Sequence, residues 1–222
     1  MSKKLVIIGG EGNGGVIAAC VEDNRRRFGD DEYEVVGFIN DFLPVGADIN
    51  GVPVIGGTDD VVHLLDSDFY FMYAIHMIGR GFLRERIFNR MAIPADRLAT
   101  IVHRSAFVAP SVTLAPGAFV MANCYIGPAT SIGQCTLVMA NCVVGHNDEI
   151  GPFNHISAGA VMSSVIKTGK FVDVCLGARV MEKLTLGDYS VAGAGALVLK
   201  DIPSREVHVG SPAKFLRYVS EE

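Results

Sequence analysis

Two histidines in a polar stretch are the part of the sequence best suited to chemistry. His146 is followed by Asn147, Asp148 and Glu149, and His155 comes nine residues after the first histidine. A nearby carboxylate raises the basicity of an imidazole and fixes its tautomer, and such a histidine suits general-base catalysis. The spacing therefore offers His146 as a proton acceptor with Asp148 as its partner, while an ordinary surface histidine fits the same pattern.

These histidines are too few to form a metal site. Zinc sites take at least three protein side chains, and solenoids such as the gamma-class carbonic anhydrases share three histidines between subunits. Here the repeats described next contain only His146 and His155, and no cysteine pair has the CxxC spacing, so we expect no metal. The cysteines fit small buried side chains in a reducing compartment; they are Cys20, Cys124, Cys135, Cys142 and Cys175.

The residues around the histidines repeat with a period of six. From Val108 to Val198 a large apolar residue opens nearly every hexad, with Thr168 and Ala192 as exceptions, and the residue four places later is usually small or slim. This period does not fit an α-helix with 3.6 residues per turn. It predicts a solenoid of short strands and corners, in which residues about eighteen apart lie above one another.

Two inward positions of this solenoid hold polar residues, namely Asp148 and Asn154. A buried polar group without a hydrogen-bond partner costs about 1–3 kcal/mol. Local rules that are broken in neighbouring repeats are typical of functional sites. The stretch from His146 to His155 is therefore the candidate site of the second half of the chain.

The first hundred residues predict a different fold. Leu5–Ile8 is a buried strand, a glycine run containing Gly12 and Asn13 follows, and residues 16–27 form a helix. The second strand, 34–39, ends at Asn40 and Asp41. Backbone amides at such a helix start can face a phosphate, and a polar residue after the second strand is where these folds contact a nucleoside.

A helix ending at 65, a strand at 69–75, a helix at 80–91 and a strand at 100–102 complete this unit. The result is half of a dinucleotide-binding fold, which favours a mononucleotide or nucleotide sugar over NAD. We expect a short Rossmann-like βαβαβ domain over residues 1–104 and the solenoid with a C-terminal tail over 105–222. Since no Gly/Ser linker separates them, the two parts should be packed together.

Composition excludes several other classes of function. The formal net charge is −5 and the basic residues form no long block, which argues against a nucleic-acid-binding protein. The apolar run near the N-terminus is only four residues long, and no stretch reaches the roughly 18 apolar residues of a membrane span. We expect a cytoplasmic protein.

The combination resembles the hexapeptide-repeat sugar acyltransferases, which include the bacillosamine-pathway UDP-amino-sugar N-acetyltransferases and the sialic-acid O-acetyltransferases. The resemblance rests on the half Rossmann unit, the histidine-containing hexads over 145–160, and the C-terminal stretch 210–214. It implies a left-handed parallel β-helix, a homotrimer, and acetyl-CoA lying between adjacent helices.

The resemblance also assigns roles to individual residues. His146 is implied as the base, and His155 as a contact of acetyl-CoA, with Leu176 and Ala194 where that co-substrate runs along the coils. Gly12 and Asn13 are implied under the phosphates of a sugar nucleotide, and the residues implied at the nucleoside are Asn40 and Asp41.

The sequence departs from the family pattern in three places. Asn147 stands where an acid usually follows the base, so Asp148 is expected to take over the orienting role from inside the coil, or else the base is less activated. Asn13 and Asn40 replace the usual histidine and acid of the nucleotide site. The segment His76–Gly79 replaces a Gly-Asn pattern after the third strand.

We therefore expect an acetyl-CoA-dependent N-acetyltransferase that acts on a nucleotide-linked 4-amino sugar, with UDP as the expected nucleotide. Transfer would be direct, with His146 as general base and no acyl-enzyme. O-acetylation of a sialic acid or similar sugar is the alternative within this class. A non-catalytic trimer that binds a nucleotide sugar is the alternative from another class.

Overall fold

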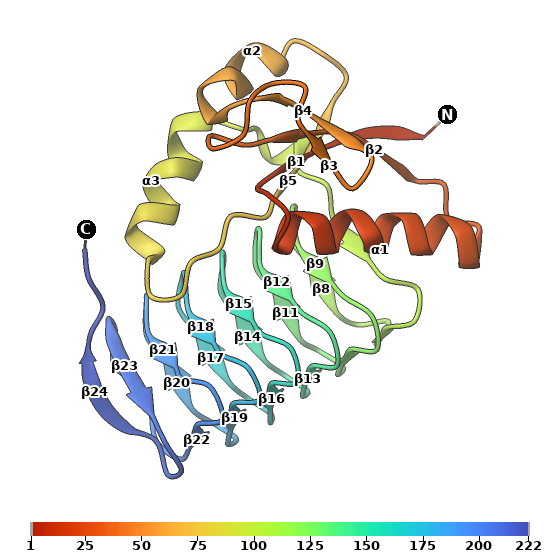
Figure 1. The fold of residues 1–222 in the computed structure, drawn as a ribbon. Coiled ribbons are helices and arrows are strands. Elements are labelled where there is room, and N and C mark those ends of the chain that lie inside the picture. The colour runs from red at the N-terminus through yellow and green to blue at the C-terminus, as the bar shows by residue number, and fades with distance from the viewer. Residues whose placement is uncertain (1, 222) are drawn as a thin grey trace.

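An α/β domain sits on one side of a long stack of short strands in the computed structural model, which describes residues 2–221 (Figure 1). The N-terminal elements, drawn from red to yellow, lie along one side of the stack. This is the predicted fold class, a short Rossmann-like unit followed by a left-handed parallel β-helix. Within the described residues, no helix combines the length and the apolar character that a membrane span requires.

The N-terminal domain is a largely parallel sheet with helices on both faces. Its strand order is β3-β4-β2-β1-β5, and β3 and β4 form an antiparallel hairpin at the edge. The central run Leu5–Ile8 is fully buried, as expected for a strand covered on both faces. In chain order the elements are β1 (Lys3–Ile8), α1 (Asn13–Phe28), β2 (Tyr33–Ile39), β3 (Asp48–Ile49), β4 (Val52–Gly56), a 3₁₀ turn (Thr58–Asp60), α2 (Val61–Leu64), β5 (Tyr70–Tyr73), α3 (Gly81–Met91) and a second 3₁₀ turn (Ala95–Arg97).

One strand predicted for this domain belongs to the solenoid instead. Residues 100–102 were expected to close the βαβαβ unit, but β6 (Ile101–Val102) pairs with β9 (Phe119–Val120). The physical reason is the coil period, because Ile101 lies eighteen residues before its partner Phe119. The solenoid therefore begins ahead of the boundary expected between residues 104 and 105.

Each coil of the solenoid contributes three short strands, which stack into three parallel sheets. The pairs Tyr125–Val143 and Val143–Val161 show the predicted eighteen-residue spacing. The sheet under the N-terminal domain, here the domain-facing sheet, contains β6, β9, β12 (Leu137–Val138), β15 (His155–Ile156), β18 (Asp173–Val174), β21 (Val191–Ala192) and the C-terminal hairpin β23 (Glu206–Val209) and β24 (Lys214–Tyr218).

The other two sheets differ in their outward side chains. The apolar sheet presents Phe107, Tyr125, Val143 and Val161, each between 39% and 55% exposed, and consists of β7 (Phe107–Val108), β10 (Tyr125–Ile126), β13 (Val143–Val144), β16 (Val161–Met162), β19 (Arg179–Val180) and β22 (Leu197–Val198). The polar sheet presents Thr113, Ser131, Glu149, Lys167 and Thr185, and consists of β8 (Thr113–Leu114), β11 (Ser131–Ile132), β14 (Glu149–Ile150), β17 (Lys167–Thr168) and β20 (Thr185–Leu186).

The apolar residues that open the hexads fill the interior, as predicted. Ile126, Val144 and Met162, for example, are completely buried. Thr168, the polar exception, uses its hydroxyl as an acceptor for the N–H of Gly151 at 2.8 Å and for the amide of Asn154. The interior is thus mostly apolar, and the hydroxyl of Thr168 is bonded to its neighbours there.

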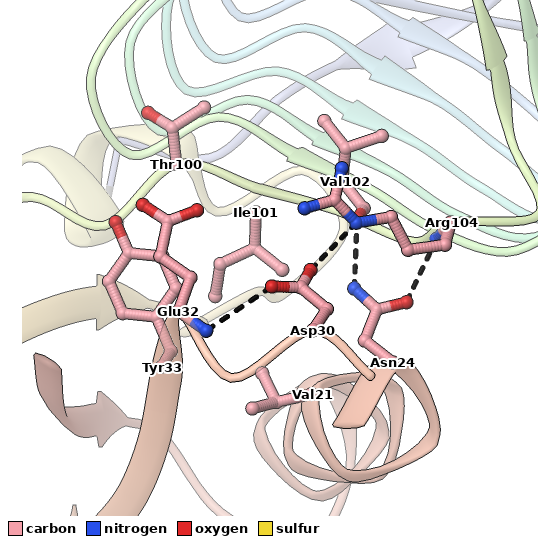
Figure 2. A pocket seen from close by; sticks show the side chains of 9 residues that line it. All are labelled: Val21, Asn24, Asp30, Glu32, Tyr33, Thr100, Ile101, Val102 and Arg104. Carbon is pink, nitrogen blue, oxygen red and sulfur yellow. Dashed lines mark hydrogen bonds and ion pairs between the residues drawn. The ribbon is translucent and has the colours of Figure 1, made fainter. Parts of the chain in front are cut away.

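Asn24 of α1 ties the N-terminal domain to the first coil. Figure 2 shows its side chain among Asp30, Val102 and Arg104, around a small cavity of about 150 Å³. Its Nδ2 donates to the carbonyl of Val102 at 2.9 Å, and its Oδ1 accepts the backbone N–H of Arg104 at 2.8 Å. Apolar residues of both parts also share one core cluster. The two parts are packed together, as the missing linker predicts.

Candidate active site

A cleft of about 690 Å³ opens at the carboxyl ends of β1, β2 and β5. β1 has β2 on one side and β5 on the other, so the order of the strands reverses at β1. Open α/β sheets bind ligands at such a switch point. The glycine loop, the turn after β2, the segment after β5 and α3 form its walls. The four residues expected at the nucleotide all line it: Gly12, Asn13, Asn40 and Asp41.

The glycine loop leads directly into α1, which begins at Asn13 rather than at the predicted residue 16. Gly14 lies so close to Ile7 and Phe38 that a Cβ would approach their side chains to 3.3 Å, so the first turn of the helix packs tightly on the sheet. No side chain caps this end, and its first turn holds no acidic residue. An uncapped helix N-terminus in a cleft favours an anion such as a phosphate.

Asn40 and Asp41 shape the turn after β2 with their side chains. Oδ1 of Asn40 accepts the N–H groups of Phe42 and Leu43 at 2.8 and 3.0 Å. Asp41 accepts the backbone N–H of Thr58 at 2.6 Å and its hydroxyl at 2.9 Å. Both side chains lie at the cleft, and both are bonded within the protein.

His155 lies on the domain-facing sheet beneath the cleft and is only 5% exposed. Its Nε2 accepts a hydrogen bond from Nδ2 of Asn13 at 3.2 Å. Nδ1 therefore carries the ring proton and donates to Oγ of Ser157 at 3.0 Å. Burial lowers the pKa of His155 to about 3, and the ring therefore stays neutral. The residue expected at acetyl-CoA thus has both ring nitrogens bonded to protein groups.

A buried cluster beside His155 contains three residues that were not predicted as site residues, namely His76, Arg84 and Asp173. Asp173 pairs with His155 in the sheet, and its Oδ1 accepts Nε2 of His76 at 3.0 Å and Nη1 of Arg84 at 3.3 Å. Its Oδ2 accepts the N–H of Gly79 at 2.7 Å. Burial favours the neutral acid, but the hydrogen bond from His76 and the charge of Arg84 outweigh it and lower the pKa of Asp173.

His76 completes this buried cluster. Its ring stacks on that of His155, with centroids 3.6 Å apart and planes 9° apart. The available sequence signal was the coil period, because Asp173 stands eighteen residues after His155 at the same outward position. Nothing in the sequence places His76 beside them, because it comes from the other domain.

His146 lies at an exposed corner between the apolar and the polar sheet. Its Nδ1 is 2.8 Å from Oδ1 of Asn147. An amide oxygen only accepts, so Nδ1 carries the proton and Nε2 keeps its lone pair for a substrate. Asn147 adopts φ 58°, a left-handed conformation that asparagine tolerates better than most residues.

The expected partnership between His146 and Asp148 is corrected by this geometry. Asp148 is fully buried inside the coil, where its Oδ1 accepts the backbone N–H of Ile166 at 2.8 Å and its Oδ2 has no partner among the described residues. The inward position of the hexad directs the carboxylate away from the corner. Asn147 orients the imidazole instead, without a charge.

Leu176 and Ala194 lie one above the other at the corner between the domain-facing and the apolar sheet, here the Leu176 corner. The N–H of Gly195 donates to the carbonyl of Leu176 at 2.8 Å, and both Leu176 and Ala194 are exposed. A Cβ added to Gly177 or Gly195 would meet nothing within 4 Å. The corner is therefore an open, narrow edge with room for an elongated ligand.

One chain does not bring all the predicted residues together. The cleft lies over the domain-facing sheet, whereas His146 stands at the corner opposite that sheet. Residues 2–221 contain no group of three or more histidine, cysteine or acidic side chains arranged to hold a metal. The cleft residues and His146 are thus two separate parts of the candidate site.

Comparisons with known proteins identify the family. Residues 4–91 match the family model of the PglD N-terminal domain. The acetyltransferase domain of PglB from Neisseria gonorrhoeae, solved in complex with acetyl coenzyme A, is 30% identical over 97% of this chain and 100% of that one, with a TM-score of 0.82. The chain belongs to the hexapeptide-repeat sugar acyltransferase family. The resemblance seen in the sequence is confirmed.

Two further structures have the architecture of this family. A histidine-to-asparagine variant of perosamine N-acetyltransferase from Caulobacter crescentus, in complex with CoA and GDP-perosamine, is 27% identical over 96% of this chain and 97% of that one, with a TM-score of 0.83. WeeI from Acinetobacter baumannii shares the fold at 20% identity and a TM-score of 0.77, over 96% and 99% of the two chains. No curated protein sequence gives a significant match.

Proposed function

We propose that the protein transfers the acetyl group of acetyl-CoA to the amino group of a nucleotide-linked 4-amino sugar. The observation that supports this proposal best is a cleft at the uncapped N-terminus of α1, directly above a hexapeptide solenoid. The perosamine enzyme, which has this architecture, binds CoA and GDP-perosamine, and the PglB domain binds acetyl coenzyme A.

In this proposal the diphosphate lies at the N-terminus of α1, near Gly12 and Asn13, where the helix dipole favours negative charge. The nucleoside lies at the turn formed by Asn40 and Asp41. Both side chains hold the turn in shape through bonds within the protein, and these bonds favour neither uracil nor guanine. Both UDP- and GDP-linked sugars therefore belong in the assay.

The acyl donor lies along the Leu176 corner, where the exposed small residues leave room for it. The sugar amine attacks the thioester carbonyl, Nε2 of His146 accepts the amine proton, and the proton passes on to the departing thiolate of CoA. The C–N bond forms as the C–S bond breaks, with no acyl-enzyme. The five cysteines are free and buried, which suits structural roles in a cytoplasmic enzyme.

His146 reaches this site from a neighbouring copy. It borders the apolar sheet, whose outward side chains are exposed in the single chain. Exposed apolar patches of this kind mark interaction surfaces. Burying the apolar sheet in a homotrimer brings the His146 corner of one copy beside the next copy, which supports a site shared between chains.

The test is a thiol-release assay with acetyl-CoA and a panel of GDP-perosamine, a UDP-linked 4-amino sugar, sialic acid and free amino sugars. We expect turnover only with a nucleotide-linked amine. Gly12→Asp should raise the KM of that substrate at least tenfold, because a carboxylate then meets the diphosphate, while a Cβ at this position has no atom within 4 Å.

The matched control is Gly12→Ser, which adds a neutral capping side chain at the same place and should change the KM far less. Release with sialic acid alone would support the O-acetyltransferase. No release with any acceptor would favour a binding protein without catalysis. Equal effects of the two Gly12 variants would remove the diphosphate from this helix end.

A further inference from the structure

A histidine–carboxylate pair lies at the cleft itself, separate from His146. Nε2 of His76 donates to Oδ1 of Asp173, because a carboxylate accepts only. The other ring nitrogen, Nδ1, has no hydrogen-bond partner in the described part of the chain, although the side chain is only 10% exposed. In a ring that donates from Nε2, a neutral Nδ1 is an acceptor, available to a donor from a ligand.

The position of His76 indicates which ligand group would meet it. His76 lines the cleft on the segment that follows β5, and its ring lies flat on His155 of the solenoid. The turn at Asn40 and Asp41 lines the same cleft but follows β2, which lies on the opposite side of β1 from β5. A nucleotide sugar that places its nucleoside at that turn directs its sugar toward the solenoid, and hence toward His76.

We infer that Nδ1 of His76 accepts a hydrogen bond from a hydroxyl or amino group of the substrate sugar, with Asp173 and the ring of His155 as its positioning residues. The inference rests on the proposed function and adds a sugar-binding residue to it. It also gives a role to the segment His76–Gly79, which departs from the pattern of the family.

A purely structural role for His76 fits the cluster less well. Asp173 finds its opposite charge in the guanidinium of Arg84 and a further donor in the backbone N–H of Gly79, while His76 contributes a hydrogen bond from one of its two ring nitrogens. Any flat aromatic ring would fill the space above His155. An imidazole has no advantage over phenylalanine here unless its nitrogens are used, and only one of them is used within the protein.

The experiment compares His76→Phe with the unchanged protein in both binding and turnover. Phenylalanine keeps the stacking on His155 and removes both nitrogens. We expect the KM of the accepted nucleotide sugar to rise roughly tenfold, with the KM of acetyl-CoA unchanged. The dissociation constants of GDP and UDP, which lack the sugar, should stay within about twofold by calorimetry.

Two further variants sharpen the result. His76→Gln offers Asp173 a donor and the sugar an acceptor, and it should recover part of the lost affinity. His63→Phe changes an exposed histidine on α2 and should change neither constant. If His76→Phe weakened the binding of GDP, UDP and the nucleotide sugar equally, His76 would only maintain the shape of the cleft. This result would overturn the inference.

An unchanged KM in His76→Phe would overturn it as well. Failure of the proposed function is a different result, namely no thiol release by the unchanged protein. In that case calorimetry with GDP-perosamine against GDP still measures the contribution of the sugar, and only a loss of that difference in His76→Phe supports the inference.

Discussion

At the scale of single residues, the carboxyl group of Asp148 gives the protein a specific pH dependence. Burial raises the pKa of Asp148 from 3.8 to about 6, so the folded state binds this proton more tightly than the unfolded chain. Its contribution to folding is therefore present at about pH 4 and lost as the pH rises to about 6. We expect Asp148→Asn to raise the free energy of unfolding by about 1–3 kcal/mol at pH 7.5 and hardly at pH 4.

Denaturant titrations of both proteins at pH 4, 5, 6 and 7.5 measure this difference. The matched control is Asn154→Asp, which places a carboxylate at the same inward position of the next hexad. There Oδ1 of Asn154 accepts the N–H of Val172 at 2.7 Å and its amide donates to Thr168. This variant should lose stability at pH 7.5. A gain from Asp148→Asn that is equal at all pH values would contradict the assignment.

The sequence identified Asp148 and Asn154 correctly as inward exceptions, because the hexad period fixes which side chains face the core. It did not show which neighbour orients His146, because that depends on the left-handed backbone at Asn147. The coil period could have pointed to Asp173 from His155, but its contact with His76 was beyond sequence reasoning, since 97 residues separate the two and only the packing of two domains brings them together.

At the scale of elements, α1 docks the N-terminal domain on the first coil through Asn24. Asn24→Ala leaves the carbonyl of Val102 and the N–H of Arg104 without their partner at a buried junction. We expect a loss of about 1–3 kcal/mol in the free energy of unfolding, measured by denaturant titration. Arg25→Ala, at the next position, removes only an exposed ion pair with Asp31 and should cost less than about 1 kcal/mol.

Equal costs for Asn24→Ala and Arg25→Ala would show that the junction is held by apolar contacts alone.

The coils were the most predictable elements, because each must present an apolar residue inward at every sixth position. Element ends were less predictable. Gly14 and Gly15 suggested a loop although they lie in the first turn of α1, and β6 was assigned to the wrong unit because two residues carry no visible period.

At the scale of the whole molecule, the three outer faces of the solenoid differ in what covers them. The N-terminal domain covers one, and the polar sheet carries side chains such as Glu149 and Lys167, which pair with each other at 2.9 Å. The apolar sheet exposes a column that includes the stacked rings of Phe107 and Tyr125. This face is the one that a trimer would bury, and the corner at His146 lies on its border.

If two copies share each active site, two impaired variants should restore activity when they assemble into mixed trimers. His146→Ala removes the proton acceptor and Gly12→Asp raises the KM, so each alone should have little activity at a substrate concentration well below that raised KM. In mixed trimers, a Gly12→Asp chain supplies its intact His146 to the intact cleft of a His146→Ala chain. With equal amounts and random assembly, about a quarter of the sites combine both intact parts, and we expect roughly that share of normal turnover.

Thiol release by the co-expressed and co-purified variants measures this recovery, with each variant expressed alone as the control. If His146 served the cleft of its own chain, every site in the mixture would retain one defect and no activity would return. Recovery therefore follows only from a site built by two copies. It would explain why the predicted base lies opposite the cleft in a single chain and why the apolar sheet is left uncovered beside it.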